Sequence, residues 1–169
     1  MSVSPELTSL EVLGVAIKSE IEAAHLYERM ERRVKNVGLK ERLSFLKSEE
    51  EKHRKIFEDL FEKKYPGVEL KLPATSMVPT MDVALTKELS VKELLEVAMK
   101  AEQISEKFYA DLAKKSKDVS GASMLTYLSS VEHGHYNLLK NEYEMVVEFP
   151  AYAETEEFLF GERLIHVGP

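Results

Sequence analysis

Two stretches of the chain, VAIKSEIEAAHLYERM (15–30) and VAMKAEQISEKFYADL (97–112), superimpose without a gap at an offset of 82 residues. The same offset places LSFLKSEEEKH (43–53) over LTYLSSVEHGH (125–135). Across 8–62 and 90–144, fifteen of 55 positions are identical, which is several times the chance level. The chain is therefore an internal repeat, and its fold follows from what one copy forms and from how the two copies pack.

Each copy has the pattern of a helical hairpin, because apolar residues recur at spacings of three and four. We expect helices at about 9–35, 39–64, 91–117 and 121–148, with prolines at 66 and 150 ending the second and the fourth. The first helix of each copy begins with a capping box, Thr8-x-x-Glu11 and Ser90-x-x-Glu93. The breaks inside each copy are short, so each pair of helices should be antiparallel.

The segment 65–89 between the copies has several prolines and little helical pattern. When extended it can reach ~80 Å, whereas a helix of 27 residues is only ~40 Å long. It can therefore cross the whole bundle and make the second and third helices parallel. We expect an all-α four-helix bundle over 1–148, with a crossover at 65–89 and a C-terminal tail at 149–169. The alternative, two hairpins on a floppy linker, would leave the apolar face of each hairpin unburied.

The core-facing stripe of every helix contains ionisable residues near its middle: Glu20, Glu50, His53, Glu102, Glu132 and His135. Burying an ionised carboxylate without a partner costs several kcal/mol, and four carboxylates also repel one another. No lysine or arginine lies on these stripes, but two divalent cations would balance the four charges. Neutral imidazoles would complete the ligand set. Residues three apart share one helix face, so each Glu-x-x-His can hold one metal ion.

Oxygen-rich ligation with a little imidazole favours iron or manganese over a structural zinc ion. A single Glu-x-x-His could equally lie on a solvated helix surface. Two such motifs, each 30 residues after a glutamate on a partner helix, form a far more specific pattern. Without metal, we expect burial and mutual repulsion to raise the pKa values of the four carboxylates and to lower the stability of the bundle.

At these residues the chain resembles the ferritin-like di-iron carboxylate proteins, and most closely the rubrerythrins. The likeness covers about 8–148 and rests on a glutamate in the first and third helices, a Glu-x-x-His in the second and fourth, and Tyr27 seven residues after the first glutamate. The resemblance implies two irons, with manganese as the alternative metal. It also implies that Glu50 and Glu132 bridge the metals, while Glu20 and Glu102 are terminal ligands.

Three departures from the relatives matter. Rubrerythrins typically carry a C-terminal rubredoxin domain, whereas this chain has no cysteine for such an iron centre. They have a further glutamate where this chain has Ser105, so Glu106, on the inward stripe, either replaces it or faces solvent. Glu51 stands where bacterioferritins have their haem-binding methionine, and we expect no haem.

The resemblance implies an oxidoreductase, a peroxidase that reduces hydrogen peroxide in oxidative-stress defence. Its electrons would come from an external donor, such as a separate rubredoxin or a flavoprotein. One alternative is ferroxidase activity with iron storage, as in ferritins, which a shell of 24 subunits would indicate. Another is an oxygenase, which needs an apolar pocket beside the metals. Tyr27 and Tyr109 are either donors to the ligand carboxylates, or radical and electron sinks, or packed core residues.

Net charge, hydropathy and the apolar tail limit which partners and which cellular location are expected. The net charge of −7, without a basic patch, argues against nucleic acid and anionic membranes. No apolar run approaches the ~18 residues of a membrane span, and no signal-peptide pattern is present, so we expect a cytoplasmic protein. We expect a homodimer, with domain swapping through the crossover as one form. The other histidines should lie at the surface: His25, His133 and His166. The apolar residues of the tail should dock on the bundle or on a second subunit: Phe158, Leu159, Phe160, Leu164 and Ile165.

Overall fold

The computed structural model describes residues 9–74 and 88–156, and within them it has four long helices and no strand. The elements in chain order are α1 (Ser9–Arg33), α2 (Val37–Lys64), α4 (Val91–Lys115), α5 (Val119–Glu148) and the short 3-10 helix η1 (Tyr152–Glu154). The long helices end within two residues of the bounds expected from sequence. The predicted all-α, ferritin-like four-helix bundle is confirmed.

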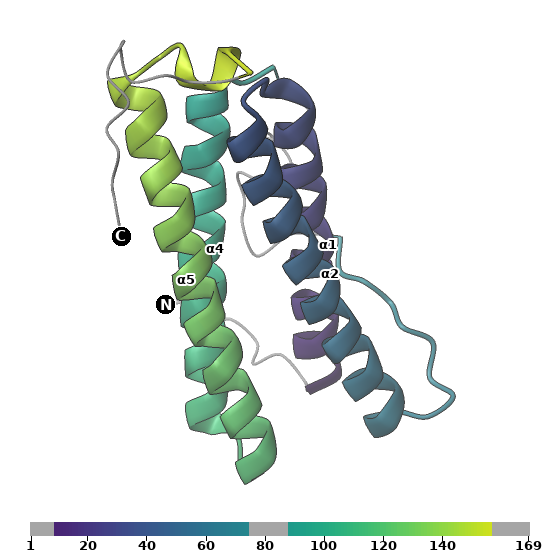
Figure 1. Cartoon of the computed structure of the whole chain (residues 1–169). Helices are drawn as coiled ribbons and strands as arrows, with labels where there is room; N and C mark the ends of the chain where they lie inside the picture. Colours follow the sequence, from purple (N-terminus) through teal and green to yellow (C-terminus); the bar gives the residue numbers. More distant parts are fainter. Residues whose placement is uncertain (1–8, 75–87, 157–169) are drawn as a thin grey trace, which may run out of the picture.

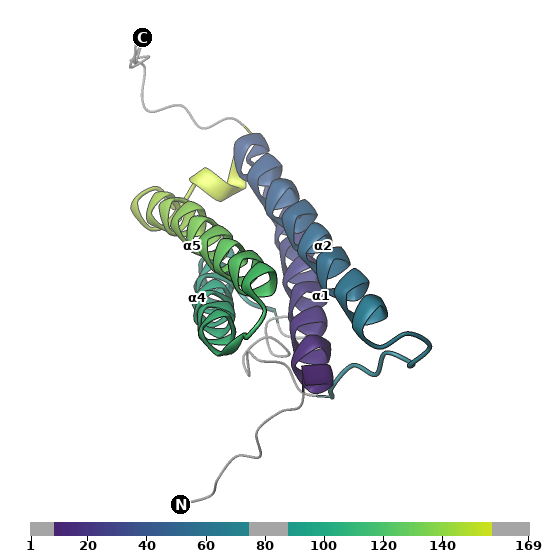
Figure 2. The ribbon, with the colours of Figure 1, turned by 90° about the horizontal axis from the view of Figure 1, so that it is seen from below.

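The helices form two antiparallel hairpins, α1 with α2 and α4 with α5, that lie side by side (Figures 1 and 2). The start of α1 and the end of α2 lie at the lower end of the bundle in Figure 1, as do the end of α4 and the start of α5. As predicted, α2 and α4 therefore run parallel. Contact between the hairpins is closest where α1 packs against α4.

The helix starts are fixed by local sequence. Asn36 and Asp118 occupy equivalent positions of the repeat, and their side chains accept backbone N–H groups in the first turns of α2 and α5. Ser90 and Glu93 form the predicted capping box of α4. The other predicted capping box begins at Thr8, which lies outside the described residues.

A polar layer divides the apolar core in two. The upper cluster includes Leu26, Leu46 and Leu139, and the lower one includes Ile17 and Phe57. The six ionisable residues singled out from sequence lie on the helices between these clusters. Apolar packing above and below therefore fixes the height at which they meet.

The buried face of α4 is rotated from the expected stripe. Met99 and Glu106, expected inside, are only half-buried. Small side chains take the interior positions beside Glu102: Ala98, Ala101 and Ser105. Since small side chains allow two helix backbones to approach, this face suits the close packing of α4 against α1.

Residues 149–156 close the upper end of the bundle. The backbone N–H of Lys35 donates to the carbonyl of Ala153 (2.7 Å), and that of Val37 donates to the carbonyl of Glu156 (3.1 Å). These two bonds join the start of the tail to the turn between α1 and α2. The apolar tail residues from Phe158 onward and His166 lie outside the described residues, so docking of the tail remains a prediction.

The first part of the crossover packs against α1. A Cβ atom on Gly14 would lie 3.2 Å from the carbonyl oxygen of Lys71, so a larger residue at this position would have to displace the crossover slightly. None of the described helices combines the length and the apolar character needed to cross a bilayer.

Candidate metal centre

All six ionisable residues predicted as ligands meet in the middle of the bundle, and each is at most 4% exposed: Glu20, Glu50, His53, Glu102, Glu132 and His135. Each long helix supplies at least one of them. The amphipathic pattern places them inside, because each sits where the apolar stripe of its helix would otherwise continue. The structure thus brings together side chains that lie up to 115 positions apart in sequence.

Glu50 and Glu132 lie between the two histidines. The Nδ1 atom of His53 is 3.2 Å from Oε2 of Glu50 and 3.1 Å from Oε1 of Glu132. The Nδ1 atom of His135 is 3.0 Å from the other oxygen of Glu50 and 3.3 Å from the other oxygen of Glu132. Each of these carboxylates therefore presents one oxygen to each imidazole.

Glu20 and Glu102 each approach one histidine. Glu20 lies 3.8 Å from His53, and Glu102 lies 3.7 Å from His135. Two four-residue groups result, and in each the candidate ligand atoms lie within 4.8 Å of one another: Glu20, Glu50, His53, Glu132; and Glu50, Glu102, Glu132, His135. The two groups share Glu50 and Glu132.

The two core tyrosines connect the hairpins crosswise. The hydroxyl of Tyr27 on α1 donates to the carboxylate of Glu102 on α4, and the hydroxyl of Tyr109 on α4 donates to Glu20 on α1. Both rings are fully buried. Of the readings open from sequence, the structure therefore favours donors that orient the outer carboxylates.

The donor set fits a pair of metal ions. Within the described residues, Oε1 of Glu50, Oε1 of Glu132 and Nδ1 of His135 are buried but have no aligned hydrogen-bond partner, although other polar atoms lie near them. Buried polar atoms are normally satisfied, so such orphans need an explanation. Two ligand atoms bound at right angles to one ion at about 2.1 Å are about 3 Å apart. The nitrogen-to-oxygen distances of 3.0–3.3 Å match that spacing.

The histidines carry the compensating charge when metal is absent. Burial alone lowers the pKa of His53 and His135, but the attraction of the surrounding carboxylates outweighs it. The pKa of His135 rises to about 12, and that of His53 is also strongly raised. The imidazoles that would be neutral metal ligands are therefore protonated in the metal-free site.

Glu132 departs from the expectation that all four carboxylates have raised pKa values. Burial raises its pKa, but the close contacts with His135 and His53 lower it to about 2. The sequence argument omitted these two cations as partners. For Glu20 and Glu102 the expectation holds, because desolvation by burial raises the pKa of each. Burial likewise raises the pKa of Tyr27 and Tyr109, which remain neutral donors.

Glu106 lies outside both candidate groups. Its carboxylate is 3.2 Å from Nδ1 of His133, which is 58% exposed. His25 is also exposed, as predicted for the histidines off the stripe. Ser105, at the position of the further glutamate of the relatives, is buried on the inner face of α4.

Sequence reasoning missed a second buried polar cluster. Glu142 on α5 is 5% exposed, forms a 3.0 Å ion pair with Arg42 and accepts a 2.7 Å hydrogen bond from the hydroxyl of Tyr152. It fastens η1 to the bundle. The available signal was that Glu142 continues the inward stripe of its helix, three residues after Leu139.

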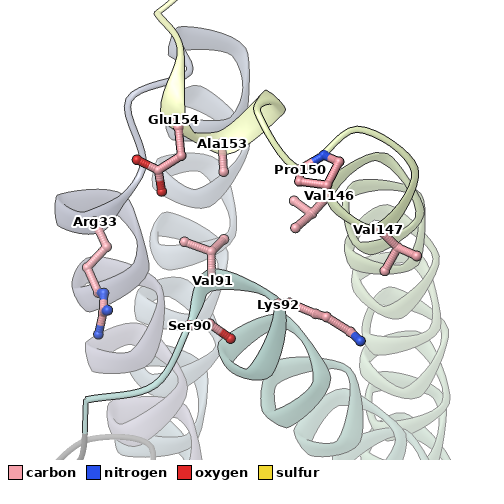
Figure 3. Close-up of a pocket in the computed structure, with 9 residues that line it drawn as sticks. All are labelled: Arg33, Ser90, Val91, Lys92, Val146, Val147, Pro150, Ala153 and Glu154. Carbon is pink, nitrogen blue, oxygen red and sulfur yellow. The ribbon is translucent and has the colours of Figure 1, made fainter.

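Two large hollows lie at the ends of the bundle, away from the six residues. The upper one, about 460 Å³, has Arg33 and Glu154 on one side and Val146 and Pro150 on the other (Figure 3). The lower one, about 650 Å³ and mainly apolar, is lined by residues that include Phe57. Neither is lined by any of the six.

The lower hollow is separated from the candidate metal centre by two rings. Phe57 packs against Tyr109 with ring centroids 5.3 Å apart, and the hydroxyl of Tyr109 donates to Glu20. The apolar pocket that an oxygenase needs therefore exists near the site, but side chains stand between them.

Comparisons with known proteins agree with this geometry. The rubrerythrin family profile matches residues 11–143. A hypothetical protein from Pyrococcus furiosus is structurally similar, with a TM-score of 0.79 and 31% sequence identity over 90% of this chain and 95% of that one. No curated protein matches the sequence.

Proposed function

Because the chain belongs to the rubrerythrin family, we propose that it is a non-haem di-iron oxidoreductase that reduces hydrogen peroxide with electrons from an external donor. The observation that carries the proposal is the sharing of Glu50 and Glu132 between two four-residue groups. A carboxylate with one oxygen toward each group is placed to bridge two ions. Glu20 and Glu102 would then be terminal ligands, and each histidine would complete one ion's set.

Two ferrous irons bound by these six residues would supply the two electrons that convert hydrogen peroxide and two protons into two molecules of water. The protein's own part is positional. Tyr27 and Tyr109 hold the outer carboxylates by hydrogen bonds, and the six candidate ligands are buried between the two apolar clusters. The electrons would come from an external donor, because the sequence contains no cysteine to hold a rubredoxin-type iron.

The partners follow from the same reasoning. A separate rubredoxin or a flavoprotein would deliver one electron at a time, and oxidative-stress defence in the cytoplasm is the setting that suits peroxide reduction. A homodimer, with or without exchanged hairpins, remains our expectation. Support comes from exposed aromatic residues at equivalent positions of the repeat, Phe45 on α2 and Tyr127 on α5, which are 50% and 63% exposed.

The test begins with metal-free protein loaded with Fe²⁺ under argon. We expect two irons per chain, oxidised faster by a stoichiometric amount of hydrogen peroxide than by dissolved oxygen, and re-reduced by added rubredoxin. The matched control is the Glu50→Leu/Glu132→Leu double variant, which should neither bind iron nor consume peroxide. Faster oxidation by oxygen than by peroxide would contradict the proposal.

Two other functions give different results in the same experiment. Iron storage would retain far more than two irons per chain when excess Fe²⁺ and oxygen are added, and the protein would elute as a large shell. An oxygenase would consume oxygen only together with an apolar substrate, and enlarging the lower hollow with Phe57→Ala would change that coupling.

A further inference from the structure

A small polar hollow between α1 and α2 reaches the candidate metal centre from the surface. Its volume is about 150 Å³, room for about five water molecules at roughly 30 Å³ each. Glu20 forms part of its lining, together with residues of the two helices: Ile21, Ala24, His25, Glu28, Lys47, Glu51 and Arg54. Glu20 and Ala24 are buried, while His25 and Glu51 are exposed, so the hollow runs from solvent to one of the six candidate ligands.

The other hollows described above do not reach the six residues, nor does one of about 300 Å³ between α4 and α5. The α1–α2 hollow is also too small for a bulky organic molecule. It suits small hydrated species, which is what a metal ion is in solution.

The repeat explains why the opening lies on this face. At the offset of 82, Ala24 corresponds to Glu106 and Glu51 corresponds to His133. On the α4–α5 face, Glu106 and His133 reach toward each other across the two helices, 3.2 Å apart. On the α1–α2 face, the methyl group of Ala24 is too short to make such a bridge, and the space beside it is part of the hollow.

The lining of the hollow carries charges of both signs, and one carboxylate among them has no ion-pair partner in the part of the chain that the structure describes. Glu51 is exposed at the mouth and has no ion-pair partner within the described residues. Glu28 is already paired, with Lys47 at 3.3 Å and Arg32 at 3.0 Å. Arg54 forms an ion pair with Glu58 at 3.5 Å, although its buried Nε atom has no aligned hydrogen-bond partner within the described residues. Glu51 is therefore the free carboxylate outside, and Glu20 is the carboxylate inside.

We propose that divalent metal ions reach the centre through the α1–α2 hollow, guided by Glu51 at its mouth and received by Glu20 at its floor, while Glu106 and His133 close the α4–α5 face. This inference rests on the proposed two-metal function. It assigns different roles to the two faces of a bundle whose interior is nearly symmetric.

The experiment measures how fast metal-free protein takes up Co²⁺, whose visible absorption reports binding, by stopped flow. The main variant is Glu51→Lys, and its matched control is His133→Lys at the equivalent exposed position. We expect Glu51→Lys to load at least threefold more slowly at low salt, with a difference that shrinks as salt is added. His133→Lys should load no more slowly than wild type. Equal rates for wild type and Glu51→Lys, or a greater slowing by His133→Lys, would overturn the proposal.

A second pair of variants exchanges the faces. Ala24→Glu/Glu51→His introduces on the α1–α2 face the Glu–His pair that α4 and α5 have, and it should slow cobalt uptake at least tenfold. Glu106→Ala/His133→Glu removes the bridge and should load as fast as wild type or faster. Circular dichroism confirms folding, and the final cobalt content should be two per chain in every variant. Slowed loading after Glu106→Ala/His133→Glu would mean that Glu106 and His133 help metal to enter rather than close the α4–α5 face, and it would overturn the proposal. Wild type that binds no cobalt, iron or manganese would instead refute the two-metal function.

Discussion

The two hairpins are alike inside and different outside. Inside, each supplies one glutamate, one Glu-x-x-His and one tyrosine at matching positions, and the contacts of one hairpin mirror those of the other. Outside, an alanine and a glutamate on one face correspond to a bridged glutamate and histidine on the other. The interior must satisfy one chemical requirement from both sides, so both copies keep it. The exterior has no such requirement, and there the two copies differ: in our proposal the α1–α2 face admits metal and the α4–α5 face is closed.

The largest effect is expected from removing the two shared carboxylates of the symmetric interior. Replacing both Glu50 and Glu132 by leucine should abolish metal binding and leave a folded bundle, because apolar side chains replace buried charge. Its melting temperature should match or exceed that of metal-free wild type and should not respond to a chelator. Wild type should melt higher with metal than without it, because metal binds the folded site far better than the unfolded chain. Elemental analysis and thermal melts check both points. Wild type whose melting is unchanged after confirmed metal loss would refute the core-metal argument.

The second prediction tests whether the mirror-related contacts are energetically equal. Tyr27→Phe and Tyr109→Phe each remove a donor to a buried carboxylate, which should cost about 1–3 kcal/mol of unfolding free energy in the metal-free protein. Urea unfolding of the two variants measures this. We expect the two losses to agree within about 0.5 kcal/mol, the margin within which the effects of independent mutations usually add. A clear inequality would show that the two halves of the interior are not equivalent.

The third prediction concerns pH. The raised pKa of His135, about 12 against 6.5 unfolded, stabilises the metal-free fold below pH 6.5, and that stability is lost as pH rises toward 12. The lowered pKa of Glu132, about 2 against 4.5, stabilises the fold above pH 4.5, and that stability is lost as pH falls toward 2. The raised pKa values of Glu20 and Glu102 act in the opposite direction to that of Glu132, because they lower the stability of the fold as pH rises above 4.5. The metal-free protein should therefore melt highest near pH 4.5. Metal-loaded protein should be most stabilised at higher pH, where its ligands are deprotonated. Parallel pH profiles of the two forms would contradict this.

The smallest effect lies away from the centre, where the copies differ. Leu60 of the first copy corresponds to Glu142, which is buried and held by Arg42 and Tyr152. Tyr152→Phe should cost about 1 kcal/mol, or about 2–4 °C in melting temperature for a chain of this size. Metal content should stay at the wild-type value. A loss of metal in this variant would mean that the upper end and the centre are coupled.

The fold and the six central residues could be predicted because each depends on patterns within one helix. The spacing of apolar residues predicted the helices, and the internal repeat predicted how they pair into hairpins. The metal site was indicated by Glu50-x-x-His53, which interrupts the apolar stripe of its helix. The crossed bonds of the tyrosines, the charged state of the histidines and the hollow beside Ala24 depend on which side chains meet across helices. Periodicity along one helix carries no such information. Glu106 shows the same limit, because the buried face of α4 includes Ala101 and Ser105 and leaves Glu106 half-buried at its edge.

The crossed tyrosine bonds also bear on the origin of the chain. Because Tyr27 and Tyr109 each reach the glutamate of the other hairpin, no contact in the centre requires the two hairpins to differ. Two identical hairpins of about 55 residues, related by a twofold axis, would assemble the same six side chains and both tyrosine contacts. The chain has the form expected if an ancestral gene encoded one hairpin, working as a symmetric pair, and was later duplicated and fused. Fusion would have allowed each copy to mutate independently, and the difference between Ala24 and Glu106 would be one result.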